Sequence, residues 1–253
     1  MTWLERLFRP RAALPVLKSM DDAQAAAERG DYETALAIWG PFAHAGDARA
    51  QNNIGACFAE GLGVARDPEL ALRWLTLSAE KGYAAGQRNL AALYFKGEGV
   101  EQNDDLALHW YRAAAGQGDA PAQDMLAWML LERGDEADLP EVISLSRSAA
   151  EAGIASSMTR LGMLHHEALG VERSPEQAAQ WWRRGAGAGD PDAEAMLGAA
   201  HLLGQGVERD GIKALALLLR AERGGSRFAP RFLKVARESL SEDEIARAAE
   251  LAG

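Results

Sequence analysis

Residues 61–82 read GLGVARDPELALRWLTLSAEKG, and residues 97–118 repeat the pattern as GEGVEQNDDLALHWYRAAAGQG. The repeat extends along the chain, because a glycine returns every 35 or 36 residues and an aliphatic side chain follows each one by eight residues. These glycines are Gly46, Gly82, Gly118, Gly153, Gly189 and Gly225. A period of this length is typical of proteins built from stacked supersecondary units.

Each unit predicts two antiparallel helices. In the first helix, Ala50, Ile54 and Phe58 are four residues apart, which places their side chains on one face, toward the core. Gly61 is suited to ending this helix, because glycine adopts left-handed backbone geometry without steric cost. Asp67 is then expected to cap the second helix.

The same capping signals recur in other units, with one irregular case. Asp47, Asp119 and Asp190 follow a repeat glycine and are expected to cap first helices, and Ser174 with Gln177 has the capping-box spacing. The third unit instead reads ERGDEADLP in its loop. There we expect Asp138, with Glu141, to cap the second helix after a tighter turn.

Tryptophans occur at equivalent positions of the second helices. Trp74, Trp110 and Trp181 are therefore predicted to be core residues. Trp128 differs, because the other units carry Ala or Met at its position. Its indole is either a local packing feature or a contact for a partner.

These residues resemble the Sel-1-like repeat (SLR) family, relatives of the tetratricopeptide repeats. The resemblance rests on AQxxIGxxFxxGxGVxxDxxxAxxW, read from Ala50 to Trp74, and on its copies over about 46–225. It implies an all-α fold, a right-handed α-solenoid (superhelix) of antiparallel helix pairs. It also implies a non-enzymatic adaptor or scaffold that binds a protein or peptide.

The repeats suggest a division of the chain into four parts. These are a basic amphipathic N-terminal segment (1–19), a tetratricopeptide-like helix pair (20–45), five Sel-1-like repeats (46–81, 82–117, 118–152, 153–188 and 189–224) and a C-terminal capping helix pair (226–253). The N-terminal segment holds apolar and basic residues that could dock on the protein itself, on a partner or on a membrane.

Composition narrows the partners and the location. The chain has 253 residues and a formal net charge of −10, which repels phosphate backbones, so nucleic acid is not an expected partner. No run approaches the roughly 20 apolar residues of a membrane span. The single cysteine, Cys57, excludes an internal disulfide framework. Some proteins of the resembled family carry a cysteine pair in every unit and are exported. The lack of such pairs here points to the reducing cytoplasm.

No motif indicates catalysis, a cofactor or a metal. The glycine-rich loops lack the continuation of a phosphate-binding loop. His165, His166 and Glu167 are adjacent on a helix and diverge by about 100° per residue, so they do not converge on one ion. Two alternatives to the adaptor function remain open. One is a metal-dependent or hydrolytic enzyme centred on the third and fourth repeats. The other is a membrane-proximal scaffold tethered by residues 1–19.

A second stripe of each first helix is the candidate binding site. The similarity to tetratricopeptide repeats implies that this stripe lines the inner groove, with an apolar centre and a charged rim. The alternative is that these side chains pack on the neighbouring unit or on the N-terminal segment. The predicted groove residues are Asn52, Arg88, Phe95, Lys96, Asp124, Trp128, Leu131, Glu132, Thr159, Met163, His166, Glu167 and Leu202.

Overall fold

The computed structural model describes residues 19–253, and every regular element within that range is helical. The predicted all-α fold class is confirmed. Residues 1–18, which make up nearly all of the predicted N-terminal segment, lie outside the described residues. Contacts divide the chain into two compact units, residues 1–122 and 123–253, and the division falls inside helix α8.

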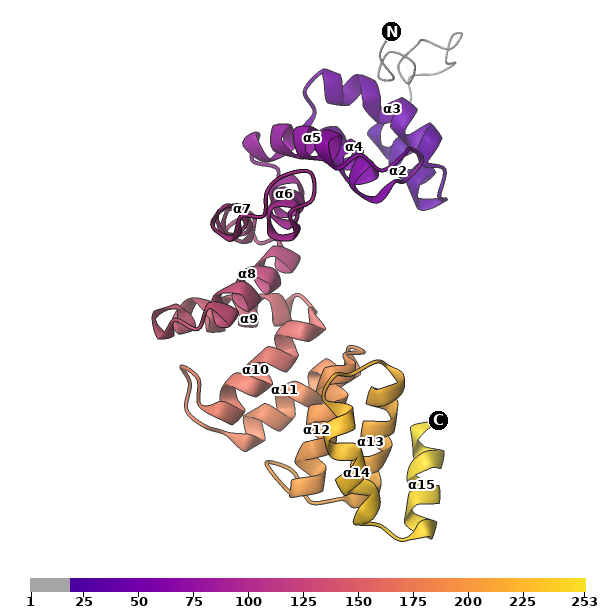
Figure 1. The fold of residues 1–253 in the computed structure, drawn as a ribbon, viewed down its shortest axis with the longest axis vertical. Coiled ribbons are helices and arrows are strands. Elements are labelled where there is room, and N and C mark those ends of the chain that lie inside the picture. The colour runs from indigo at the N-terminus through magenta and orange to yellow at the C-terminus, as the bar shows by residue number, and fades with distance from the viewer. Residues whose placement is uncertain (1–18) are drawn as a thin grey trace. The chain divides into compact units, whose positions relative to one another are not determined.

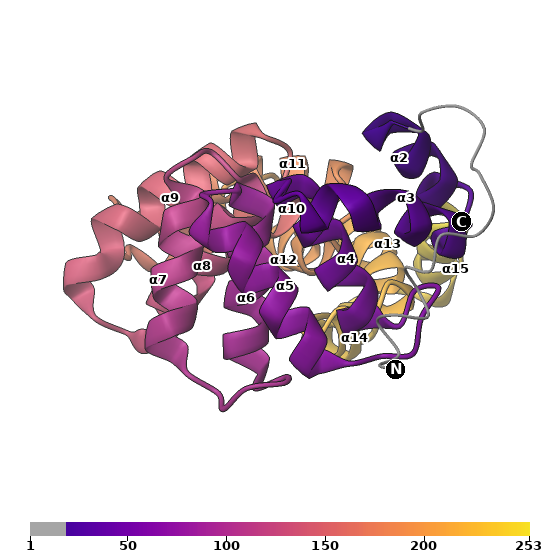
Figure 2. The same cartoon turned by 90° about the horizontal axis from the view of Figure 1, so that it is seen from above.

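The first unit is a succession of helices joined by short turns (Figure 1). They are α2 (Met20–Glu28), α3 (Tyr32–His44), α4 (Ala48–Glu60), α5 (Pro68–Glu80), α6 (Ala84–Lys96), α7 (Asp104–Ala115) and the start of α8 (Ala120–Arg133). The main contacts within repeats join α4 to α5 and α6 to α7, and α4 also touches α6. Figure 2 shows α4 and α5 as neighbours from a second direction.

The second unit continues the alternation. It holds the rest of α8, the short helix η1 (Glu136–Asp138), α9 (Leu139–Glu151), α10 (Ala155–Glu167), α11 (Pro175–Gly187), α12 (Pro191–Leu203), α13 (Gly211–Arg223), α14 (Ala229–Glu238) and α15 (Glu242–Ala252). The pairs α10–α11 and α12–α13 make the largest contacts, while α12 also touches α10 and α14. Within this unit, the α12–α13 pair therefore packs on the pair before it and on α14 after it.

The core follows the predicted apolar stripe of the first helices. Ala50, Ile54 and Phe58 are all almost completely buried. The aliphatic side chains that follow the repeat glycines are buried as well: Ile54, Leu90, Leu126, Leu161, Leu197 and Leu233. The spacing of four residues thus identified the face of each first helix that meets its partner helix.

The predicted N-caps are present as hydrogen bonds. Asp67 Oδ1 accepts from the Leu70 amide at 3.0 Å, and the Asp47, Asp119 and Asp190 carboxylates accept from amides at the starts of their helices. Ser174 Oγ likewise accepts from the Gln177 amide. These bonds satisfy amides that have no partner within the helix.

The third repeat does not follow the prediction for its cap. The Asp138 side chain makes no cap bond to α9 and instead binds Arg133 at the end of α8. Asp135 caps the short helix η1, which takes up the altered loop. The expected role of Asp138 was wrong because its carboxylate has a cation within reach on the preceding helix.

The expected burial of the tryptophans also needs correction. Trp74, Trp110 and Trp181 are only half-buried, and Trp181 lies under the Arg184 guanidinium at 4.3 Å. The next position in each second helix is the one that faces the first helix. It holds Leu75, Tyr111, Ser146, Trp182 and Leu218, all of them buried. In the fourth repeat, Trp182 covers Gly162 so closely that any side chain there would collide with the indole.

The loop glycines join one repeat to the one before it. Gly99 has φ +74°, and a Cβ atom at this position would collide with the carbonyl group of Pro68, at the start of the preceding second helix. Gly206 meets Pro175 in the same way. Glycine is needed here for two reasons, backbone conformation and close approach.

We expect Gly99→Ala to destabilise the protein more than Gly118→Ala. Both glycines have positive φ, so both variants carry about 1–2 kcal/mol of left-handed strain. Only Gly99 faces another backbone, whereas the space around Gly118 is open. Urea unfolding of the two variants measures the difference, and equal losses would contradict this account of the loop.

We also expect Trp182→Ala to cost about 3–5 kcal/mol of unfolding free energy, the usual loss for a large buried aromatic side chain. Trp181→Ala is the matched control and should cost clearly less, because its indole is half-exposed. Thermal and urea unfolding measure both. A larger loss for Trp181→Ala would reverse the assignment of the core position.

Candidate functional site

The predicted groove residues lie on the first helices of the repeats. In the first unit they lie on α4 and α6, and in the second on α8, α10 and α12. The structure separates them into two groups. Those near the helix starts bond to the next repeat, and those near the helix ends, apart from Leu202, remain at least partly accessible.

In the first unit, Asn52 and Arg88 connect successive repeats. Asn52 is only 7% exposed, and its Oδ1 accepts a hydrogen bond from Asn89 Nδ2 at 2.8 Å. The Arg88 guanidinium pairs with Asp119 at 2.6 Å, and Asp119 also caps α8. These two side chains therefore stabilise the stacking of helices and are not free for a partner.

In the second unit, Asp124 and Thr159 have the same role. Asp124 accepts from Ser157 Oγ at 2.5 Å and from Arg160 Nη1 at 2.8 Å, and the Arg160 side chain is only 8% exposed. Thr159 is buried and donates to the carboxylate of Asp190, the cap of α12. The buried Arg160 guanidinium needs the Asp124 carboxylate as its partner, because an unpaired charge away from water is costly.

Leu202 is inside the C-terminal core. It is 5% exposed and packs in the same cluster as Leu215 and Leu218 of α13 and Leu233 of α14. Its side chain cannot reach a partner in this structure. The sequence missed this because residues 226–253 were treated as a separate cap, and the packing of α14 against α12 does not follow from the repeat period.

The remaining predicted residues lie near the ends of the first helices. Phe95, Trp128, Leu131, Met163 and His166 are half-buried, and Lys96, Glu132 and Glu167 are exposed. Met163 packs on the cluster that contains Trp182 and Leu197. Within each unit, these positions combine partly accessible apolar side chains with exposed charged ones, as the core and rim of an interface do.

Two accessible residues of this surface were not predicted. Leu203 is 57% exposed and occupies the repeat position of Glu132 and Glu167. Val235, on α14, is 54% exposed and occupies the position of Trp128 and Met163. The signal for Val235 was available, because carrying the repeat spacing past Gly225 leads to it.

We refer to these second-unit residues as the open face. It consists of Trp128, Leu131, Glu132, Met163, His166, Glu167, Leu203 and Val235. They lie on α8, α10, α12 and α14, the consecutive first helices of this unit (Figure 1).

The three adjacent residues at 165–167 have different environments. His165 is buried, and its Nδ1 lies 3.5 Å from the carbonyl oxygen of Glu172 in the following loop. The His166 ring lies 5.6 Å from the ring of Trp182, and Glu167 is exposed. Within residues 19–253 no group of three His, Cys, Asp or Glu side chains is arranged to hold a metal ion. The same residues include no helix long and apolar enough to cross a membrane.

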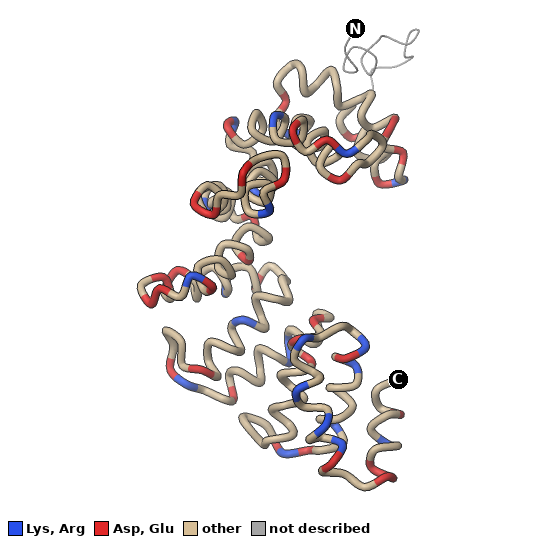
Figure 3. Tube along the Cα trace, viewed as in Figure 1, with Lys and Arg blue, Asp and Glu red and all other residues tan. Residues whose placement is uncertain are grey.

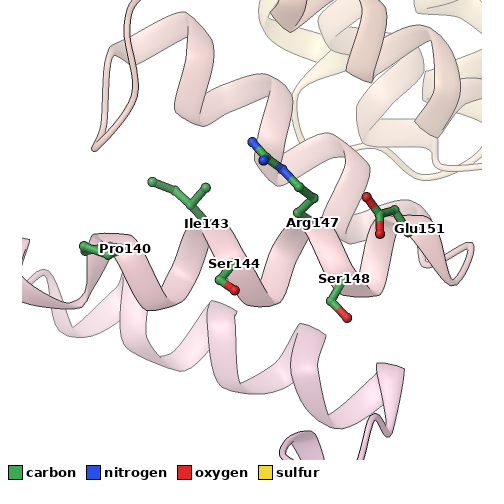
Figure 4. A pocket seen from close by; sticks show the side chains of 6 residues that line it. All are labelled: Pro140, Ile143, Ser144, Arg147, Ser148 and Glu151. Carbon is green, nitrogen blue, oxygen red and sulfur yellow. The ribbon is translucent and has the colours of Figure 1, made fainter.

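A shallow pocket of about 330 Å³ lies along α9 (Figure 4). All of its lining residues come from this one helix: Pro140, Ile143, Ser144, Arg147, Ser148 and Glu151. Figure 4 shows them along the helix without convergence on one point.

The chain is similar to known repeat proteins along most of its length. The Sel1 repeat profile matches residues 48–83, 84–119, 120–154, 155–190 and 191–226. No curated protein matches the chain.

Solved structures agree in fold. The protective antigen c5321 of uropathogenic Escherichia coli displays an SLR fold and is 29% identical to this chain, with a TM-score of 0.83. The match covers 92% of this chain and 55% of the antigen, so this chain spans about half the length of the antigen. A Sel1 repeat protein from Oxalobacter formigenes is 27% identical with a TM-score of 0.80, covering 92% of this chain and 96% of that one. The immunity protein Pa5087 from Pseudomonas aeruginosa, 22% identical with a TM-score of 0.50 over 81% of this chain and 80% of that one, shares the fold alone.

The Cys57 thiol should be chemically inert in the folded protein. It is 2% exposed, and burial raises its pKa to about 11, so very little reactive thiolate forms at neutral pH. We expect a thiol reagent such as Ellman's reagent to react only as the protein unfolds in urea. Because the unfolded thiol ionises first, stability should fall as the pH rises above the range of an ordinary cysteine.

A suitable control is Ser144→Cys in a Cys57→Ala background, because Ser144 is exposed. This variant should react at once in native buffer. Equally fast reaction of native Cys57 would show that the first unit opens readily around α4.

Proposed function

Because this chain belongs to the Sel1 repeat family, whose members are generally scaffolds for protein interactions, we propose that it binds a segment of a partner protein on the open face of its second unit. The observation that carries this proposal is the apolar exposure near the ends of the first helices. Leu203 and Val235 are more than half exposed, and Trp128 and Met163 are accessible beside charged residues.

The proposal assigns different tasks to the two ends of the first helices. Side chains at the starts, such as Asp124 and Thr159, are already occupied by bonds to the next repeat. Trp128, Met163 and Leu203, nearer the helix ends, have apolar surface still in contact with water. Removing that surface from water favours association by about 25 cal/mol per Å² before the costs of binding are counted.

Trp128 is the proposed anchor of the interaction. Tryptophan is among the residues that contribute most to binding when they sit at the centre of an interface. Glu132, near the end of α8, and Glu167, at the end of α10, are exposed and would form part of a polar rim.

We further propose that the chain acts without catalysis and in the cytoplasm. The scaffold character of the family supports the first statement. The single buried cysteine supports the second, because Cys57 has no second cysteine with which to form a disulfide. A metal assay of untagged protein tests the enzymatic alternative, which stoichiometric zinc would revive.

We expect Trp128→Ala to abolish affinity capture of the native partner while the melting temperature stays within a few degrees. Loss of a central aromatic contact removes binding energy, whereas a half-buried side chain contributes less to the core. Capture from native cells with quantitative mass spectrometry, together with a thermal melt of each variant, measures both effects.

Leu251→Ala is the matched control, because Leu251 is 65% exposed on α15, outside the open face. It should retain capture. Capture that survives Trp128→Ala would refute the proposed site, and unfolding of that variant would assign Trp128 to the core.

A further inference from the structure

We propose that α14 extends the open face with a basic surface that recognises an acidic segment of a partner protein. This inference rests on the proposed function, since it assigns a chemistry to the partner. It departs from the sequence-based view of residues 226–253 as a cap, because a cap would only shield the last repeat from water.

The α14 helix has two clearly different faces. Ala229, Leu233 and Ala236 are buried against the C-terminal core. Because successive helical residues are about 100° apart, Arg231 and Val235 share the opposite face. Both are exposed, so the helix offers a solvent-facing surface that combines a cation with an apolar side chain.

This surface is basic in an acidic protein. Residues 226–238 carry four cations, Arg227, Arg231, Lys234 and Arg237, against one carboxylate, Glu238, although the chain has a net charge of −10. Figure 3 shows several Lys and Arg positions in this C-terminal part of the chain.

Two of the four cations are partly compensated and two are not. Arg227 lies 3.5 Å from Asp192, and Lys234 lies 3.8 Å from Glu238. Among residues 19–253, Arg231 and Arg237 have no carboxylate within ion-pair distance. Both guanidinium groups are thus available to a ligand, Arg231 on the face of Val235 and Arg237 about 120° around the helix, on the other side of Lys234.

The ring of Phe228 helps to orient the arginines. The Arg227 and Arg231 guanidinium carbons lie 4.9 and 5.7 Å from its centroid. A guanidinium held by an aromatic ring keeps N–H groups free to donate to a carboxylate, and arginine can do so with two parallel bonds. This arrangement favours carboxylate ligands.

The charge of the rest of the chain favours a peptide over a larger anionic surface. At physiological ionic strength, charges are screened over about 8 Å, so a segment lying on α14 responds mainly to the local cations. A membrane or a nucleic-acid duplex extends further and meets the acidic remainder of the protein. Val235 then provides apolar contact for a side chain of the bound segment.

The test is fluorescence anisotropy with the full chain and labelled peptides of Glu, Ser and Leu, with Gln replacing Glu in a neutral counterpart. We expect the acidic peptide to bind more tightly and to weaken as salt is added. The variant Arg231→Glu with Arg237→Glu should weaken it by about tenfold or more, because two attractive contacts become repulsive.

The matched control is Arg147→Glu with Arg183→Glu, which changes the net charge equally at exposed positions of α9 and α11. It should alter acidic-peptide affinity by less than about twofold, since screening confines these charges to their surroundings. Equal weakening by both double variants would overturn the inference. Equal affinity for the neutral peptide, or preferential binding to phosphatidylserine vesicles or duplex DNA, would overturn it as well.

Trp128→Ala separates this inference from the proposed function. If native-partner capture depends on Trp128 but not on Arg231 and Arg237, the function stands and the basic surface is rejected. If acidic-peptide binding depends on the two arginines while capture is insensitive to Trp128, the basic surface stands and the proposed anchor is rejected.

Discussion

Each helix pair of this protein can bury its apolar side chains only against the pairs before and after it, and the whole structure depends on that constraint. Close approach between helices is achieved by small residues opposite large ones, as at Gly162 beneath Trp182. Close approach between repeats is achieved in the loops, as at Gly99 against Pro68. The sequence repeats because every pair must solve the same two packing problems.

Polar side chains complete the contact between repeats. Asn52 with Asn89 in the first unit, and Asp124 with Arg160 in the second, connect successive first helices away from most of the solvent. Such bonds have strict geometry, so they set how one helix is positioned on the next. They also remove these side chains from the set available for binding.

Much of the fold could be predicted from the sequence, because its signals are local. The step of four residues from Ala50 to Phe58 identifies a buried face, and Asp67 before Pro68 identifies a helix start. The tryptophan prediction was only partly right: Trp74 and Trp110 pack against the core but stay partly exposed, because recurrence shows equivalence between repeats and not full burial. Those indoles lie at the edge of the contact, one position before the residue that faces the first helix.

The candidate site was harder to predict for a physical reason. Whether Arg88 or Thr159 faces solvent depends on an acidic residue about thirty positions later and on how both side chains are oriented. A single helix face contains both residues bonded to the next repeat and residues open to solvent. Periodicity could therefore identify the face but not tell these two groups apart. Val235 is the opposite case, because continuing the repeat spacing past Gly225 predicts its position.

The hydrogen bonds between helices also bear on how the chain folds as it is made. Ser78 bonds to Ala48, Asn89 to Asn52 and Arg160 to Asp124, and each link spans no more than about one repeat of sequence. Contacts between residues this close in sequence close only short loops, so they form quickly. During synthesis, a repeat emerging from the ribosome finds its neighbour already present, and the protein can assemble progressively from its amino-terminal end.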